Sequence, residues 1–326
     1  MAGRILVTGG AGYLGGALVA ELVRDGEAVT VMTGPDDHAV QLRGLDRSVE
    51  VVRADITDED SVDAAMRGIS YVYHLAGIAS PNSRLAHKIW NANVLGSYHV
   101  AQSALRSGVQ RVVHVSSTAA VGYPPDGVVA DERFDVRDSV LDNVYAATKR
   151  AGERVMLDFG KRGLDVVVVN PAAVFAPGSG TPRSWQGLLA MAQRGLLRVV
   201  PPGGTAVCSA RDFVIGTTAA MAKGGVGERY ILSTANLSYL RIAQLLVEAM
   251  GRDHSVRTLP MGLFRAAGAT SRMIRDVTGT ARHDDPLVPE NVELMARQVY
   301  YDSGKAEREL GIPRMSAAEL ITEFAR

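Results

Sequence analysis

The chain contains a single cysteine, Cys208, among its 326 residues. One thiol excludes an intrachain disulfide and also excludes a metal centre built from several cysteines. Cys208 is most simply a small residue of the hydrophobic core. We expect no metal site in this protein.

The chain also lacks an excess of charge of either sign, because Lys plus Arg and Asp plus Glu both number 35. No net field therefore attracts nucleic acid or a membrane surface. No basic run interleaved with aromatic residues is present, so nucleic-acid recognition has no support. The hydrophobic fraction of 47% and the charged fraction of 21% are ordinary for a globular protein, and the length suffices for two lobes.

Long hydrophobic runs are missing as well. The four valines at 166–169 are bracketed by Asp165 and by Asn170 and Pro171, so they predict a short buried strand rather than a membrane span. The first ten residues already contain a strand pattern, which leaves no room for a signal peptide. We therefore expect a cytoplasmic protein.

The N-terminus carries the pattern of a strand, a glycine-rich turn and a helix start. Residues 5–8 are apolar or small and run into glycines at 9, 12 and 15, after which apolar residues recur at helical spacing. The free N–H groups and the dipole of a helix start favour an anion, and a Cβ in the turn would block a pyrophosphate. The pattern indicates nucleotide binding rather than a glycine turn without a ligand.

Strands and helices alternate over the first 170 residues. Beyond the first strand we expect strands at 28–32, 49–54, 71–75, 111–115 and 165–169. We expect helices that begin after Thr57 or Asp58 and run through Met66, and helices at 93–105 and 145–159. This alternation predicts an α/β fold with a doubly wound parallel sheet of the Rossmann type, in which ligands bind at the carboxyl ends of the strands.

After residue 171 the helices become shorter, and Pro and Gly are frequent at 177–204. We expect a strand at 229–232 and amphipathic helices at 237–250 and 316–324, which together predict a smaller α/β lobe for the substrate. The predicted division is a dinucleotide-binding domain at 1–170, rejoined by a segment near 205–235, and a lobe at 171–326 that mainly binds substrate.

Tyr145 and Lys149 stand four residues apart on one predicted helix, so both project from the same face. A cation close to a phenol favours the phenolate and lowers the pKa of the phenol. A tyrosine tuned in this way can exchange a proton with a carbonyl or alcohol oxygen. Taken alone, the pair would more often be a packed Tyr and a solvated Lys on an amphipathic helix.

A run of hydroxyl side chains, Ser116, Ser117 and Thr118, follows the strand predicted at 111–115. One of them could hold the same oxygen, or the run could simply cap a helix. Combined with the glycine turn and the Tyr–Lys pair, it resembles the extended short-chain dehydrogenase/reductase family over nearly the whole chain. The matching stretches are T-G-G-A-G-Y-L-G at 8–15, A-D-I-T-D at 54–58, H-L-A-G at 74–77, N-V-L-G-S at 93–97, V-S-S-T-A-A-V at 115–121, Y-A-A-T-K at 145–149, N-P-A-A-V-F at 170–175 and R-D-F-V at 211–214.

The resemblance implies roles for four catalytic residues. Tyr145 would be the general acid/base, and Lys149 would lower its pKa and bind the nicotinamide ribose. Thr118 would hydrogen-bond the substrate oxygen. Asn93 would support a water path to the lysine, unless it is an ordinary polar residue on the helix surface.

The resemblance also implies a site for NAD or NADP. Asp55 would flank the adenine, although the residue could instead cap a helix. The residues implied to line the site are Gly9, Gly12, Tyr13 and Leu14 at the pyrophosphate, Asp55 and Ile56 at the adenine, Leu75, Ala76 and Gly77 at the ribose and phosphates, Thr33 at the 2′ end, Pro171 to Val174 at the nicotinamide, and Ser116, Tyr145 and Lys149 beside it.

The 2′ end of the cofactor site departs from the family pattern. Thr33 and Gly34 stand where an acidic residue would grip the ribose of NAD or an Arg would signal NADP. Asp36 or Asp37 could reach back for NAD, and Arg43 could reach a 2′-phosphate. Because no carboxylate stands where it would repel the phosphate, we favour NADP slightly.

The reaction class is the remaining choice. Sugar 4,6-dehydratases of this family carry Asp-Glu after the threonine, whereas Ala119 and Ala120 stand here. Arg211 suits either a nucleotide-sugar diphosphate or an ion pair with an Asp. Epimerases usually have an Arg-rich C-terminal stretch, but residues 282–287 are mostly acidic, and the tract at 259–264 with Met273 and Ile274 is apolar.

We therefore expect an NAD(P)-dependent ketone reductase or alcohol dehydrogenase acting on a small carbonyl or alcohol substrate. The alternative is a nucleotide-sugar epimerase with bound NAD. A homodimer through the helices that hold Asn93 and Tyr145 is also implied by the resemblance.

Overall fold

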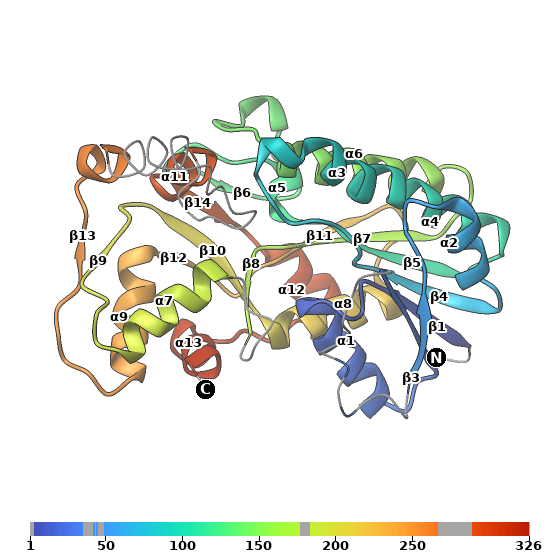
Figure 1. Ribbon diagram of the computed structural model, residues 1–326, viewed down its shortest axis with the longest axis horizontal. Coiled ribbons are helices and arrows are strands. Elements are labelled where there is room, and N and C mark those ends of the chain that lie inside the picture. Colours follow the sequence, from blue (N-terminus) through green and yellow to red (C-terminus); the bar gives the residue numbers. More distant parts are fainter. Residues whose placement is uncertain are drawn as a thin grey trace.

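The computed structural model describes residues 3–34, 42, 44, 49–176, 183–266 and 289–325. It shows two lobes, a large one that contains the N-terminus and a smaller one that contains the C-terminal helix (Figure 1). Each lobe is organised around its own sheet.

A seven-stranded parallel sheet forms the centre of the large lobe, in the order β11-β7-β5-β4-β1-β2-β3. Its strands are β1 (Arg4–Thr8), β2 (Val29–Thr33), β3 (Val49–Arg53), β4 (Ile69–His74), β5 (Arg111–Val115), β7 (Val166–Pro171) and β11 (Arg229–Leu232). All the strands expected from the sequence form, within one or two residues at most of their ends. The predicted doubly wound sheet is confirmed, and β11 adds a late segment of the chain to its edge.

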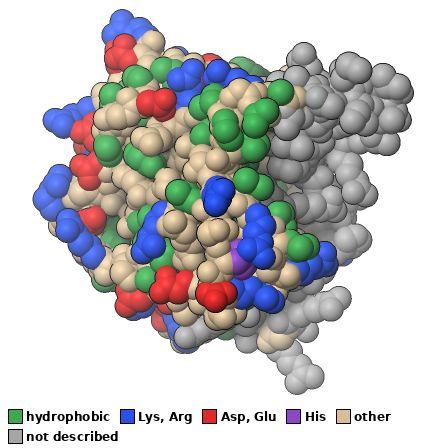
Figure 2. All heavy atoms as spheres, turned by 90° about the vertical axis from the view of Figure 1, so that its left-hand side faces the viewer, with side chains coloured by type: hydrophobic (Ala, Val, Ile, Leu, Met, Phe, Trp, Pro, Cys, Tyr) green, Lys and Arg blue, Asp and Glu red, His purple; other side chains and the backbone are tan. Residues whose placement is uncertain are grey.

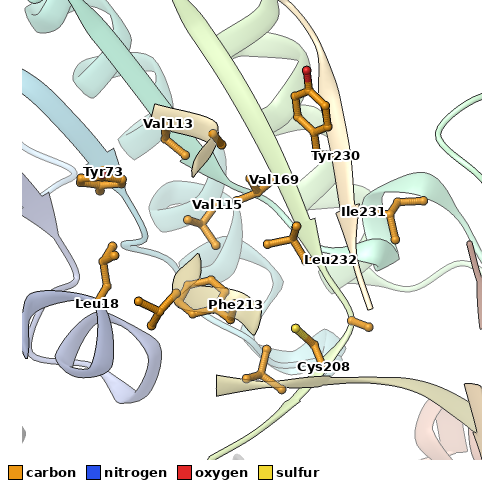
Figure 3. Packing of buried hydrophobic residues seen from close by; sticks show 14 of the residues in the cluster. Leu18, Tyr73, Val113, Val115, Val169, Cys208, Phe213, Tyr230, Ile231 and Leu232 are labelled. Carbon is orange, nitrogen blue, oxygen red and sulfur yellow. The ribbon is translucent and has the colours of Figure 1, made fainter. Parts of the chain in front are cut away.

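Helices cover both faces of this sheet (Figure 1). On one face, α1 (Tyr13–Arg24) and α8 (Ala210–Lys223) bury Leu18 and Phe213 against Val115 and Val169 of the strands (Figure 3). On the other face, α2 (Glu59–Ala65), α4 (Gly96–Arg106) and α6 (Val144–Gly160) pack on the alternate strand residues, among them Val168. Strands buried on both faces explain the continuous valine runs in the sequence.

The helices of this lobe begin and end close to their expected positions. The Asp58 side chain accepts a hydrogen bond from the amide of Asp60 and caps α2, one of the two caps expected. The helix expected at 93–105 is longer, because α3 (Ala86–Trp90), a π-helical segment (Asn91–Leu95) and α4 form one continuous run. A short helix, α5 (Thr118–Val121), follows β5 and leads towards α6.

The smaller lobe contains a five-stranded sheet in the order β12-β10-β14-β6, with β8 paired to β10. Its strands are β6 (Val129–Ala130), β8 (Ala173–Phe175), β10 (Gly204–Ser209), β12 (Ala235–Ser238) and β14 (Gln298–Tyr301), while β9 (Val199–Val200) pairs with β13 (Arg257–Thr258). The further helices in the C-terminal half of the chain are α7 (Arg183–Gln193), α9 (Tyr239–Ala249), α11 (Pro289–Met295), α12 (Gly304–Leu310) and α13 (Ala317–Ala325).

Helices α9 and α13, both expected from the sequence, bury Ile242, Leu246 and Phe324 in the core of this lobe. Cys208 on β10 is fully buried, as predicted. The division into domains at residue 170 remains a prediction.

Figure 2 faces the end of the smaller lobe, where acidic and basic side chains are interspersed with apolar ones. Within the described residues, no helix is both long enough and apolar enough to cross a membrane.

Candidate active site

The turn after β1 carries glycines at positions where a side chain would not fit. Gly9 has a φ of 69°, and a Cβ on it would lie 2.8 Å from the amide nitrogen of Ala76. A Cβ on Gly15 would run into the carbonyl oxygen of Gly9. Gly12 caps the helix without a side-chain hydrogen bond, and no acidic residue stands in the first turn. A helix start of this kind suits an anion.

The strands beside this turn bring the other segments to it. The Thr8 hydroxyl at the end of β1 lies 2.8 Å from Nδ1 of His74 at the end of β4. The Tyr13 hydroxyl contacts the backbone of Val174 and Ala176, with an oxygen–oxygen distance of 3.2 Å to Ala176. The glycine turn and the segment after β7 therefore meet at one edge of the sheet, as the sequence suggested.

The residues expected around the adenine and ribose lie at the ends of the neighbouring strands. Asp55 is exposed, and one of its oxygens accepts hydrogen bonds of 2.8 Å from the amide and hydroxyl of Thr57. The carbonyl of Ile56 contacts His99. Thr33 is buried at the end of β2. Asp36, Asp37 and Arg43 lie outside the described residues.

Tyr145 stands in the first turn of α6, which follows the Asn143 cap. Burial raises the pKa of Tyr145 above its ordinary value, while the Ser117 side chain acts in the opposite direction. Lys149 is not among the groups that shift this pKa, so its expected effect on Tyr145 remains a prediction. The lysine ammonium donates instead to the carbonyl oxygen of Val115, at 2.8 Å.

Lys149 is only 9% exposed, and this burial lowers the pKa of its ammonium to about 8. It faces His74 on β4 and His114 on β5, whose rings lie 5.1 Å apart. Burial and the lysine charge lower the pKa of His74 to about 3 and the pKa of His114 well below its ordinary value. Both histidines are therefore neutral, and the ammonium lies at the end of β5.

Thr118 is the first residue of α5, and its side chain acts to lower the pKa of Tyr301 on β14, against the larger effect of burial. Tyr301 in turn donates to the carbonyl of Gly122, at 2.6 Å. Ser117, rather than Thr118, is thus the hydroxyl residue that acts on the pKa of Tyr145. Ser117 was not assigned a role from the sequence, although it is adjacent to the residue that was.

Asn93 lies in the π-helical segment and is buried. Its side chain exchanges hydrogen bonds of 2.7 and 3.1 Å with the backbone of Ile78 and donates to the hydroxyl of Thr148, at 3.1 Å. Gly77 lies so close that a Cβ there would be 2.7 Å from the Asn93 side-chain oxygen. Asn93 therefore ties the loop after β4 to α6 beside Lys149, and the water path remains a prediction.

Two of the buried polar residues next to the site, Glu153 and Asn170, were given no role from the sequence. Glu153, one turn beyond Lys149 on α6, accepts a hydrogen bond of 2.7 Å from Asn170 and one of 3.0 Å from Arg229. Asn170 also donates to the carbonyl of Ser117, at 3.0 Å. The hydroxyl of Ser116 is buried and has no hydrogen-bond partner among the described residues.

The segments used to choose the reaction class are only partly described. Asp212, next to Arg211 at the start of α8, is buried. Its carboxylate accepts a hydrogen bond from the Thr234 hydroxyl. Residues 282–287, Met273 and Ile274 lie outside the described residues. In the tract at 259–264, Phe264 is buried in a small cluster and Leu263 is 60% exposed.

These residues fit a dinucleotide cofactor. The helix start without an acidic residue suits a pyrophosphate, and the turn has no room for a side chain at Gly9 or Gly15. The unpaired Ser116 hydroxyl and the Tyr145 phenol lie at the same edge, where a nicotinamide and its ribose would be held.

Known proteins resemble the chain in sequence and in fold. Residues 5–233 match the model of the NAD dependent epimerase/dehydratase family. Sterol demethylase protein B of Methylococcus capsulatus is 31% identical over 94% of this chain and 92% of its own. The 4-hydroxy-2-methyl-3-oxo-4-farnesyl-3,4-dihydroquinoline-1-oxide ketoreductase of Stigmatella aurantiaca is 28% identical over 94% of this chain and 91% of its own.

A solved structure of DesIV, a dTDP-glucose 4,6-dehydratase from Streptomyces venezuelae with NAD bound, superimposes with a TM-score of 0.76. It is 24% identical and covers 99% of this chain and 96% of its own, so the likeness supports the fold alone.

Proposed function

Since the chain belongs to the NAD-dependent epimerase/dehydratase family, we propose that it is a reductase of a ketone, or a dehydrogenase of the corresponding alcohol, with Tyr145 as general acid/base. The family and the enzyme class expected from the sequence, an NAD(P)-dependent oxidoreductase, are those of its curated relatives.

One observation carries this proposal. Tyr145 and Lys149 lie on one face of α6, and the lysine ammonium reaches the end of β5, at the edge where the glycine turn opens. A proton donor and an anion-binding helix start thus share the carboxyl edge of a parallel sheet, the place where such folds bind their ligands.

The bound cofactor supplies or accepts a hydride at its nicotinamide. Tyr145 gives its proton to the ketone oxygen during reduction and takes it back during oxidation. Its raised pKa keeps the phenol protonated, which suits the role of proton donor. The Ser117 side chain acts to lower the pKa of the phenol, and the Lys149 ammonium stabilises the negative charge left after proton transfer.

Thr118 remains a candidate to orient the substrate oxygen. Its side chain acts to lower the pKa of the Tyr301 phenol, as a donated hydrogen bond would. A ketone oxygen requires a donor, so Ser117 competes for the role. Asn93 supports the site by holding the backbone of Ile78 against α6.

One observation disfavours a dehydratase, and another favours a reductase over an epimerase. Ala119 and Ala120 follow Thr118 and cannot supply the acid and base of a dehydratase. Among the relatives, one is named a ketoreductase and another a 3 beta-hydroxysteroid dehydrogenase/Delta 5-->4-isomerase. These names, together with that of the sterol protein, favour an apolar ketone as substrate.

NADP is the cofactor we favour. Thr33 closes β2 without a carboxylate, so no negative charge at that position repels a 2′-phosphate. Calorimetric titration of the purified protein with NADPH and with NADH tests this choice, and tighter binding of NADH would contradict it. The cytoplasmic location and the homodimer remain predictions.

The reaction class is tested by what the purified protein contains and does. We expect a protein that releases no NAD on denaturation and that oxidises NADPH or NADH when a ketone is added. Tightly held NAD in the denatured supernatant, together with no oxidation of added cofactor, would favour the epimerase.

The role of Tyr145 is tested by Tyr145→Phe, which should lower kcat by roughly 10²- to 10⁴-fold while cofactor binding is retained. Tyr98→Phe is the matched control, because it removes a phenol that is 38% exposed on α4. Turnover of Tyr145→Phe close to that of the control would refute the assignment.

A further inference from the structure

We propose that Glu153 is a positioning residue of this active site, because its buried carboxylate joins the ammonium of Lys149 to the backbone that carries Ser117. The inference rests on the proposed roles of Tyr145 and Lys149 and adds a residue that touches neither substrate nor cofactor. Its two links are a charge along α6 and a chain of hydrogen bonds through Asn170.

The first link follows from the helix itself. Residues 145, 149 and 153 recur every four positions, so Tyr145, Lys149 and Glu153 lie on one face of α6 at successive turns. Glu153 is 3% exposed. A buried carboxylate near a buried ammonium favours the charged form of the lysine. Its charge raises the pKa of Lys149 and so opposes the effect of burial.

The second link is a chain of hydrogen bonds. The side-chain nitrogen of Asn170 donates to Glu153 Oε2 at 2.7 Å and to the Ser117 carbonyl at 3.0 Å. A carboxylate only accepts hydrogen bonds, so it dictates that the amide nitrogen of Asn170 points toward it. The same nitrogen is then available to Ser117. The amide of the preceding residue, Ser116, donates to the carbonyl oxygen of Val169 at 2.8 Å. This bond fixes the backbone just before Ser117.

The consequence for catalysis lies at the Ser117 side chain. Ser117 caps α5, and its side chain acts to lower the pKa of Tyr145. If Glu153 becomes neutral, the Asn170 amide can turn over and present its oxygen to the Ser117 carbonyl, which repels it. The Ser117 hydroxyl then loses its fixed position at the phenol.

Other charged and titratable groups around these residues do not replace Glu153. His74 on β4 and His114 on β5 face Lys149, but both are neutral because burial holds their pKa values far below neutrality. Arg229 on β11 faces Glu153 and pairs with it at 3.0 Å. Arg229 bonds to Oε1 of the carboxylate, whereas Asn170 bonds to Oε2, so Arg229 does not stand in the hydrogen-bond chain that leads from Glu153.

The first test measures the lysine directly and needs neither cofactor nor substrate. The chain has five lysines, so the protein labelled with ¹³Cε-lysine gives few signals, and Lys149→Met assigns the one of interest. We expect a titration midpoint near 8 in the wild type and a clearly lower midpoint in Glu153→Gln. An unchanged midpoint in Glu153→Gln would overturn the electrostatic link.

Asp165→Asn is the matched control for this substitution. Asp165 pairs with Arg111 at 2.8 Å, and both are part-buried beside the large sheet, but no described hydrogen bond leads from them to Ser117. The control changes the same chemical group, and we expect it to leave the Lys149 midpoint and kcat at wild-type values. If the Lys149 midpoint shifts equally in Asp165→Asn, the loss of any ion pair would explain the effect. That result would overturn the proposal.

The second test uses activity on whichever ketone the wild type reduces. Glu153→Gln should lower kcat by roughly 10- to 100-fold with little change in the KM of the cofactor. The fall of activity at high pH should also begin at lower pH, because the lysine loses its proton earlier. A pH profile with unaltered shape and wild-type kcat would contradict the proposal.

Glu153→Asp keeps the charge but shortens the reach to Asn170. We expect the lysine midpoint to stay near the wild-type value while kcat falls, and this variant also serves if Glu153→Gln does not fold. Wild-type kcat in Glu153→Asp would refute the hydrogen-bond link. The two proposals can fail separately. An active Tyr145→Phe variant would contradict the proposed function. An inactive Tyr145→Phe variant, together with wild-type kcat and a wild-type lysine midpoint in Glu153→Gln, would contradict only this inference.

Discussion

The buried ammonium of Lys149 should make the protein less stable at neutral pH than at high pH. Burial lowers the pKa of Lys149 from its ordinary 10.5 to about 8. Each pH unit of such a difference corresponds to about 1.4 kcal/mol, so keeping the charged lysine in the folded protein costs about 3 kcal/mol near pH 7.

The sign follows from proton binding. Between about pH 8 and 10.5 the unfolded chain holds the lysine proton more tightly than the folded protein does, so the free energy of unfolding rises with pH. Raising the pH from 7 to 10 should therefore increase the free energy of unfolding by about 2 kcal/mol through this group. Lys149→Met carries no such proton and should not show this gain.

Urea unfolding at pH 7, 8, 9 and 10, followed by the fluorescence of Trp90 and Trp185, measures the effect. The difference in unfolding free energy between Lys149→Met and the wild type should move by about 2 kcal/mol in favour of the wild type across this range. The hydrogen bond lost at Val115 adds a constant to that difference and does not change its slope with pH.

Lys161→Met is the control for this experiment, because Lys161 is 78% exposed and pairs with Asp158 at the surface. Exposed pairs contribute little, so its difference from the wild type should stay within about 0.5 kcal/mol at every pH. If the difference for Lys149→Met is as flat as that of the control, the ammonium is not desolvated and the reasoning is refuted.

Three further predictions concern the turn, the hydroxyl run and the buried ion pair. Ser117→Ala should lower kcat about tenfold and Thr118→Val less, and a larger loss in Thr118→Val would restore the role that the sequence implied for Thr118. Gly15→Ala should abolish NADPH binding in calorimetry, because its Cβ meets the turn backbone, whereas Gly187→Ala, with open space on α7, should bind normally. Arg229→Met should lower the free energy of unfolding in urea by about 2–3 kcal/mol, since it leaves a buried carboxylate unpaired, and a loss below about 0.5 kcal/mol would contradict this.

The central sheet and the glycine turn could be predicted because their signals are local. Residues 5–8, 111–115 and 166–169 are apolar runs of strand length, and each is followed at once by turn or hydroxyl residues. The glycines at 9, 12 and 15 are needed by backbone geometry within a few residues of themselves. The smaller sheet was not predicted strand by strand, because β6 has two residues and β8 has three.

The protonation of the site could not be predicted in the same way. Spacing places Lys149 on the face of Tyr145, but it does not say whether the ammonium contacts the phenol or a carbonyl 34 residues away in the sequence. The pKa of Tyr145 is raised because burial outweighs the effect of the Ser117 side chain, which opposes it. In the sequence, Glu153 looks like an ordinary charged residue on the surface of a helix. Its partner Arg229 lies 76 residues further along the chain, so no local pattern indicates the ion pair.

One face of α6 thus carries a phenol, an ammonium and a carboxylate at successive turns, and Arg229 extends the alternation of charge to the edge strand β11. Removing one partner of a buried ion pair leaves the other charge uncompensated, so the Glu153 carboxylate depends on Arg229. The helix of 17 residues holds their spacing without help from a loop. The carboxylate that raises the pKa of Lys149 is therefore held from the other side by a residue of the edge strand β11.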